Sequence, residues 1–120
     1  MSPTPENIAN KIRTWSANYT GTRKVADLAK YLKNEYPSIE FEINRGNVTL
    51  GALIGTISIE MKANADLFLL SELKRDITSY LTVSNSVIVI VSSPKDGIVD
   101  EFTSFLREKG LEDDVLIVEI

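Results

Sequence analysis

Residues 39–62 read IEFEINRGNVTLGALIGTISIEMK and contain two hairpin signals in one short stretch. Gly46-Asn47 and Gly55-Thr56 each separate segments in which apolar and polar residues alternate. Two-residue connections that contain glycine are typical of tight turns between antiparallel strands. The stretch therefore predicts a three-stranded antiparallel meander.

The two turns also predict a register. Counting outward from them places Glu42 opposite Gly51, and Gly51 opposite Glu60. Because side chains alternate between the two faces of a strand, one face of the meander is expected to be apolar and the other polar. The expected apolar face comprises Ile39, Phe41, Ile43, Leu50, Ala52, Ile54, Ile57, Ile59 and Met61. The expected polar face comprises Glu40, Glu42, Asn44, Thr49, Gly51, Ser58, Glu60 and Lys62, with Leu53 as an apolar exception.

Glu60 and Lys62 stand two positions apart on the last strand of this meander, so they share its polar face. A carboxylate that holds a hard cation, beside a lysine that orients or deprotonates the attacking water, is the arrangement of a metal-dependent phosphodiesterase. The alternative is an ion pair on the flank of the sheet, with Glu42 as a further partner across it. The pair alone does not separate these interpretations.

The segments around the meander favour an α/β fold. Apolar residues recur at helical spacing in two segments before it and two after it, and residues 87–91 form an unbroken apolar run typical of a strand buried on both faces. The expected helices cover residues 5–18, 22–36, 66–81 and 97–109, and the expected strands outside the meander cover residues 87–91 and 115–120. The predicted order is ααβββαβαβ.

Composition limits the chemistry that is available. The chain has 120 residues, which predicts one domain, residues 1–120, with a core of ordinary size. It contains no Cys and no His, which excludes disulfides, thiolate zinc sites, imidazole ligands and Ser-His or Cys-His nucleophiles. Because no long apolar run or secretory segment is present, we expect a soluble cytoplasmic protein without membrane contact.

The net charge of −4 hides an asymmetry along the chain. Residues 1–62 carry eight Lys and Arg against six acidic residues, whereas residues 63–120 carry five against eleven. Basic residues of the first half, in particular Arg23, Lys24 and Arg45, are therefore candidate contacts to a phosphate backbone. The alternative is that these side chains belong to solvated helix faces.

The Glu60 and Lys62 pair and the element order resemble the PD-(D/E)XK nuclease superfamily, whose restriction-endonuclease-like fold also occurs in archaeal Holliday junction resolvases. The similarity spans about residues 22–92 and is closest over residues 53–62, LIGTISIEMK. It implies a mixed sheet flanked by helices, with the meander followed by parallel strands. In that interpretation residues 5–21 are an N-terminal helical extension, and residues 93–120 add a C-terminal helix and strand.

The resemblance also implies a function. Glu60 and Lys62 match the glutamate and lysine of the family motif and would be catalytic in a DNA endonuclease that depends on Mg²⁺ or Mn²⁺. The family's metal-binding aspartate falls at Gly51, which makes Glu42 the substitute, and a frequent helix glutamine falls at Asp76. The implied metal ligands are thus Glu60, Glu42 and Asp76.

Three functions remain open from the sequence. The chain is a magnesium-dependent endonuclease, a degenerate nuclease fold that binds nucleic acid or a protein without cleavage, or a protein interaction module unrelated to nucleic acid. Resolvase-like nucleases usually act as dimers because their substrates are two-fold symmetric, so a homodimer is expected, with the first helix as a candidate dimer surface.

Overall fold

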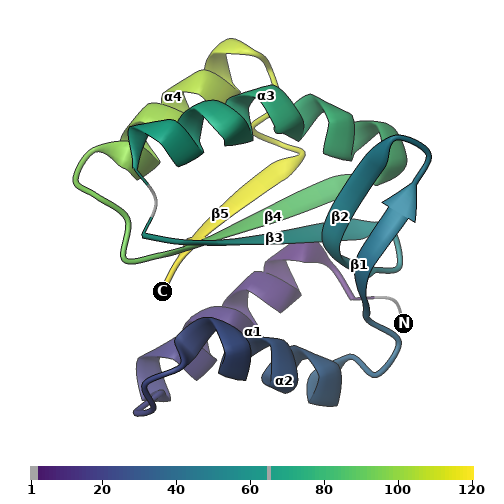
Figure 1. The fold of residues 1–120 in the computed structure, drawn as a ribbon, viewed down its shortest axis with the longest axis vertical. Helices are drawn as coiled ribbons and strands as arrows, with labels where there is room; N and C mark the ends of the chain where they lie inside the picture. Colours follow the sequence, from purple (N-terminus) through teal and green to yellow (C-terminus); the bar gives the residue numbers. More distant parts are fainter. Residues whose placement is uncertain (1–2, 65) are drawn as a thin grey trace.

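The computed structural model describes residues 3–64 and 66–120 and contains one mixed sheet in the order β1-β2-β3-β4-β5 (Figure 1). The strands β1 to β3 pair antiparallel, and β4 is parallel to both β3 and β5. The strands are β1 Glu40–Arg45, β2 Val48–Ile54, β3 Ile57–Ala63, β4 Ser86–Ser92 and β5 Val115–Glu119. The helices are α1 Pro5–Asn18, α2 Lys24–Glu35, α3 Leu67–Val83 and α4 Ile98–Glu108. The predicted α/β class and the order ααβββαβαβ are confirmed.

The helices cover the two faces of the sheet in pairs, with α1 and α2 on one face and α3 and α4 on the other (Figure 1). The central strand β4 contributes side chains to the hydrophobic core on each face of the sheet. Val87, Val89 and Val91 pack toward α3 and α4, whereas Ile88 and Ile90 pack toward α1 and α2. The unbroken apolar run in this strand is explained by burial on both faces. None of the described helices is long and apolar enough to cross a membrane.

Helix α1 belongs to the core of the chain. Its side chains Ile8, Ala9 and Ile12 are completely buried and pack with Leu28 and Leu32 of α2 beneath the sheet. The helix begins after Thr4, whose hydroxyl oxygen accepts a hydrogen bond from a backbone N–H of the first turn. The apolar stripe of α1 is therefore used within the chain, and the homodimer stays a prediction.

The meander has the predicted pairing next to its two turns, but the backbone pairs do not include Glu42 with Gly51 or Gly51 with Glu60, and its faces differ from the prediction. Phe41 pairs with Ala52, and Ile43 pairs with Leu50, as the turns indicate. Ala52 packs toward α1 and α2, whereas Ile43 and Leu50 pack toward α3 and α4. Phe41 is 38% exposed and is not part of either core. The expectation of one continuous apolar face is therefore wrong.

The faces exchange at the level of Glu42 and Gly51. Glu42 has a φ of 50°, in the left-handed region that side chains seldom adopt inside a strand, so the alternation of β1 is interrupted there. In β2 the change falls at Gly51, because Leu50 and Leu53 pack on the same side of the sheet. The end of the β1–β2 hairpin consequently curves over toward α3 (Figure 1).

Candidate functional site

Glu60 lies in β3 and is only 7% exposed. Its Oε1 accepts a hydrogen bond of 2.8 Å from the backbone N–H of Gly51. A Cβ atom at position 51 would lie 3.1 Å from Oε2 of Glu60, so glycine leaves the space that this carboxylate occupies. The backbone pairing of β2 with β3 runs from Ile54 and Ile57 to Ala52 and Ile59. Beyond that pair, the Glu60 side chain connects the two strands.

Some neighbours of Glu60 raise the pKa of its carboxyl group, and others lower it. Burial raises the pKa of this carboxyl group, and the hydrogen bond from Gly51 and the charge of Lys62 oppose that rise. The negative charge of Asp76 raises the pKa further. Lys62 and Asp76 therefore both lie close enough to Glu60 to act on its charge.

Helix α3 contributes Asp76 and Tyr80, which are four residues apart and so lie on one helix face. Tyr80 is 7% exposed. Burial raises the pKa of Tyr80 to about 12, and the negative charges of Glu60, Asp76 and Glu72 act in the same direction. The phenol is therefore a neutral donor and acceptor at physiological pH.

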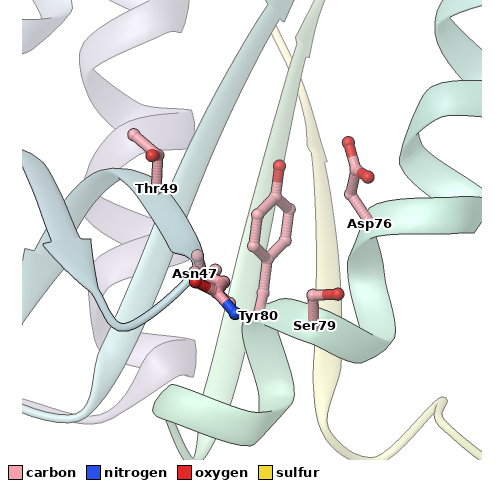
Figure 2. Close-up of a pocket in the computed structure, with 6 residues that line it drawn as sticks. Asn47, Thr49, Asp76, Ser79 and Tyr80 are labelled. Atoms are coloured by element: carbon pink, nitrogen blue, oxygen red, sulfur yellow. The ribbon is translucent and has the colours of Figure 1, made fainter.

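A pocket of about 260 Å³ lies between the β1–β2 turn and α3. Its lining residues are Asn47, Val48, Thr49, Asp76, Ser79 and Tyr80. Figure 2 shows the ring of Tyr80 between Thr49 and Asp76, with its hydroxyl pointing into the open space. The curvature of the hairpin places Asn47 and Thr49 here, since a flat meander would keep them away from α3.

The predicted metal ligands do not form a set. Asp76 reaches Glu60 electrostatically, but Glu42 lies exposed on β1. Across residues 3–64 and 66–120, no group of three or more Asp, Glu, His or Cys residues is placed to hold a metal ion. Lys62 is partly exposed in β3, where it pairs with Val91 of β4. The structure thus associates Glu60, Lys62 and Asp76 and leaves Glu42 outside.

The candidate phosphate contacts are divided between the two faces of the sheet. Arg23 is the N-cap of α2 and Lys24 is its first residue, so both belong to the α1 and α2 side (Figure 1). Arg45 ends β1 beside the turn that lines the pocket. They therefore do not form one basic surface around Glu60.

Other basic residues of the first half have partners within the chain. Lys11 forms an ion pair of 3.0 Å with Glu35 on the neighbouring helix. Lys33 donates a hydrogen bond of 2.7 Å to the carbonyl oxygen of Pro37, just after its own helix ends. Part of the positive charge that suggested a phosphate contact is thus used to hold α1 and α2 in place.

Sequence reasoning missed Tyr80, Ser79 and Asn47 as site residues. The spacing of Asp76 and Tyr80 is a signal for a shared helix face, and it was available in the sequence. Asn47 carries no such signal, because its position near α3 depends on the curvature of the hairpin.

Replacing Glu60 with glutamine is expected to remove part of the pH dependence of stability. Because the pKa of Glu60 in the folded chain lies above its ordinary value of 4.5, the folded state keeps this proton to higher pH than the unfolded state. The free energy of unfolding of the wild type therefore falls as the pH rises from 4.5 through the raised pKa. Glutamine does not titrate, so the variant lacks this fall.

Urea titrations of both proteins at several pH values measure the effect. The free energy of unfolding of the variant minus that of the wild type should increase over this interval, since all other carboxylates contribute equally to both proteins. A difference that stays constant from about pH 4 to 7 contradicts the assignment of a raised pKa to Glu60.

Comparison of the chain with protein-family models, with curated proteins and with solved structures gives no match. The resemblance to PD-(D/E)XK nucleases therefore stays a prediction from residues 53–62 and the element order. The site consists of a buried carboxylate that accepts a hydrogen bond from a backbone N–H, beside a polar pocket lined by a neutral phenol.

Proposed function

We propose that this chain is a degenerate PD-(D/E)XK nuclease domain, which keeps the nuclease scaffold, does not cleave DNA and serves as a binding module for a protein partner. The order ααβββαβαβ, with Glu60 and Lys62 on the third strand of the meander, supports the nuclease ancestry. The hydrogen bond between Glu60 and Gly51 carries the proposal that cleavage is lost.

The loss of cleavage follows from the ligands that magnesium requires. Mg²⁺ prefers octahedral coordination by oxygen atoms, including one or two carboxylates and several water molecules. At Gly51, where the family has an aspartate, this chain has no side chain, and the Glu60 carboxylate fills the adjoining space. One carboxylate oxygen already accepts the Gly51 N–H, so Glu60 is better suited to holding the two strands together than to holding a cation.

Charge favours a protein partner over nucleic acid. The pocket lies on the face covered by α3 and α4, which belong to the half of the chain with five basic and eleven acidic residues. Nucleic acid binding depends on neutralising phosphates with Lys and Arg. Arg23 and Lys24 lie on the opposite side, so a polyanion at this pocket would meet the carboxylate of Asp76 with only Arg75 and Arg45 near it.

A second candidate function is the magnesium-dependent DNA endonuclease implied by the resemblance. The observation in its favour is that the charges of Lys62 and Asp76 both act on Glu60. In that mechanism Glu60 and Asp76, with Glu42 brought nearer, hold Mg²⁺ or Mn²⁺, and Lys62 orients the attacking water. A metal ion would then replace the hydrogen bond to Gly51.

Cleavage assays separate the two candidates. We expect the full chain, at high concentration with Mg²⁺ or Mn²⁺, to leave branched, single-stranded and duplex DNA intact, because the metal set is incomplete. Lys62→Ala is the matched control for contaminating nuclease. Cleavage by the wild type that Lys62→Ala abolishes overturns the proposal and establishes the endonuclease.

Binding assays test the choice of partner class. Fluorescence anisotropy with labelled duplex and single-stranded DNA should show no saturable binding at physiological salt. Saturable, salt-sensitive binding that weakens on Arg45→Ala would instead establish a non-cleaving nucleic acid binder, because phosphate contacts release counterions and depend steeply on salt.

A further inference from the structure

We infer that the pocket between the β1–β2 turn and α3 binds an alkylguanidinium or alkylammonium group. Such a group is the end of an arginine or lysine side chain, or a small free amine. The inference rests on the proposed function, because a catalytic metal ion held by Asp76 and Glu60 would compete for the same face. The inference specifies which chemical group of the partner the binding module recognises.

Tyr80 provides the first reason. Tyr80 is 93% buried, since only 7% of it is exposed. Within residues 3–64 and 66–120 no fully buried side-chain nitrogen or oxygen lacks a hydrogen-bond partner, so the Tyr80 hydroxyl is the part of this residue that solvent in the pocket reaches. Figure 2 shows this hydroxyl pointing into the pocket. A ligand in the pocket can therefore replace water at this hydroxyl while the rest of the side chain stays packed.

The second reason is the set of acceptors around that hydroxyl. Asp76 supplies a carboxylate, of which Oδ1 accepts a 3.3 Å hydrogen bond from the exposed Arg75 and Oδ2 remains available. The hydroxyl of Thr49 donates to Asn44 Oδ1 at 2.9 Å, so its oxygen can still accept from a ligand. Several acceptors around one neutral phenol match a group that only donates, as guanidinium and ammonium do.

The third reason is the sign of the local charge. Three carboxylates, those of Glu60, Asp76 and Glu72, raise the pKa of Tyr80, which places a negative potential at the phenol oxygen. Lys62 lowers the pKa of Glu60 and offsets part of this potential, and Arg75 pairs with Asp76 at the rim. The balance favours a cation.

The size of the pocket limits the ligand. Pockets for drug-sized molecules range from about 300 to 1,000 Å³, whereas this pocket measures about 260 Å³. The end of one side chain fits this volume, and a folded domain or a nucleobase stack does not. A planar guanidinium can bond Asp76 Oδ2 and donate to the hydroxyl of Tyr80 from the pocket.

An NMR titration of the ¹⁵N-labelled full chain tests the inference. The probes are the peptide acetyl-Gly-Arg-Gly-amide, its uncharged citrulline analogue, ethylguanidinium and n-butylammonium. We expect the arginine peptide to shift the amide signals of residues 47–49 and 76–80, and the citrulline peptide to bind at least about tenfold more weakly, since a charge-assisted hydrogen bond is lost.

Variants locate the binding. Asp76→Asn and Tyr80→Phe keep the size of each side chain and are each expected to weaken binding of the arginine peptide, the first by about tenfold or more. Asp113→Asn is the matched control, because it removes an exposed carboxylate from the turn after α4 and should leave the affinity unchanged. The amide spectrum of each variant, recorded without peptide, reports whether it is folded.

The outcomes are separable from those of the cleavage assay. Three outcomes overturn the cation pocket and leave the proposed function standing. The citrulline peptide binds as tightly as the arginine peptide, the shifts are confined to other residues, or the chain leaves DNA intact and binds no peptide. Cleavage of DNA overturns the proposed function whatever the peptide does. Tighter binding of the peptide than of the free cations assigns the group to a partner chain, and equal affinities assign it to a small amine.

Discussion

The variant Gly51→Asp is expected to be less stable than the wild type without metal and to regain stability when Mg²⁺ or Mn²⁺ is added. The new side chain begins 3.1 Å from Oε2 of Glu60, so Glu60 must move, and its hydrogen bond to the Gly51 N–H is weakened. The new carboxylate then repels that of Glu60, which is only 7% exposed. We expect a loss of about 2–3 kcal/mol in the free energy of unfolding without metal.

A divalent cation should reverse much of this loss. It would bind the aspartate and Glu60 in the folded chain only, and a ligand that binds only the folded state raises the free energy of unfolding. Urea titrations with and without millimolar MgCl₂ or MnCl₂ measure the effect. This outcome would support the alignment of Gly51 with the family's metal-binding aspartate.

The matched control is Gly51→Asn, which has almost the same shape and no charge. It should show the steric part of the destabilisation and no response to metal. If Gly51→Asp unfolds identically with and without metal, then position 51 does not correspond to the family's aspartate. Combining Gly51→Asp with Glu60→Gln should also abolish the response, because one of the two carboxylates is removed.

The second large effect is expected for Ile12→Ala in α1. Ile12 is 0% exposed and packs in the core between the sheet and the two N-terminal helices. Truncation of a buried isoleucine to alanine removes apolar contacts and leaves a cavity, which costs about 2–5 kcal/mol. Chemical denaturation of wild type and variant measures this loss.

Thr14→Ala is the control in the same helix. Thr14 is exposed, and surface substitutions usually change stability by less than about 0.5 kcal/mol. If Ile12→Ala costs no more than Thr14→Ala, then α1 is a detachable extension of a core that is stable without it. The burial of Ile8 and Ile12 makes us expect the opposite.

The element order and the strand pairing could be predicted from the sequence because their signals are local. Helical periodicity and the turns at residues 46–47 and 55–56 depend on neighbouring residues, and the pairs Ile43 with Leu50 and Ala52 with Ile59 follow by counting from the turns. Glu60 could also be predicted from a local signal, which is its spacing from Lys62 on one strand. The structure places it beside Gly51 and within electrostatic reach of Asp76.

The α/β class, the meander and the closeness of Glu60 to Gly51 can thus be predicted from local patterns. The direction in which the hairpin curves, and with it the pocket lined by Thr49, Asp76 and Tyr80, depends on packing between distant segments. Counting residues along a strand assumes that every residue keeps an extended backbone, and Glu42, with its φ of 50°, does not. The side chains of β1 and β2 therefore change from one face of the sheet to the other at Glu42 and Gly51. This change buries Ile43 and Leu50 against α3 and α4. The gain in burial depends on residues that are distant in the sequence.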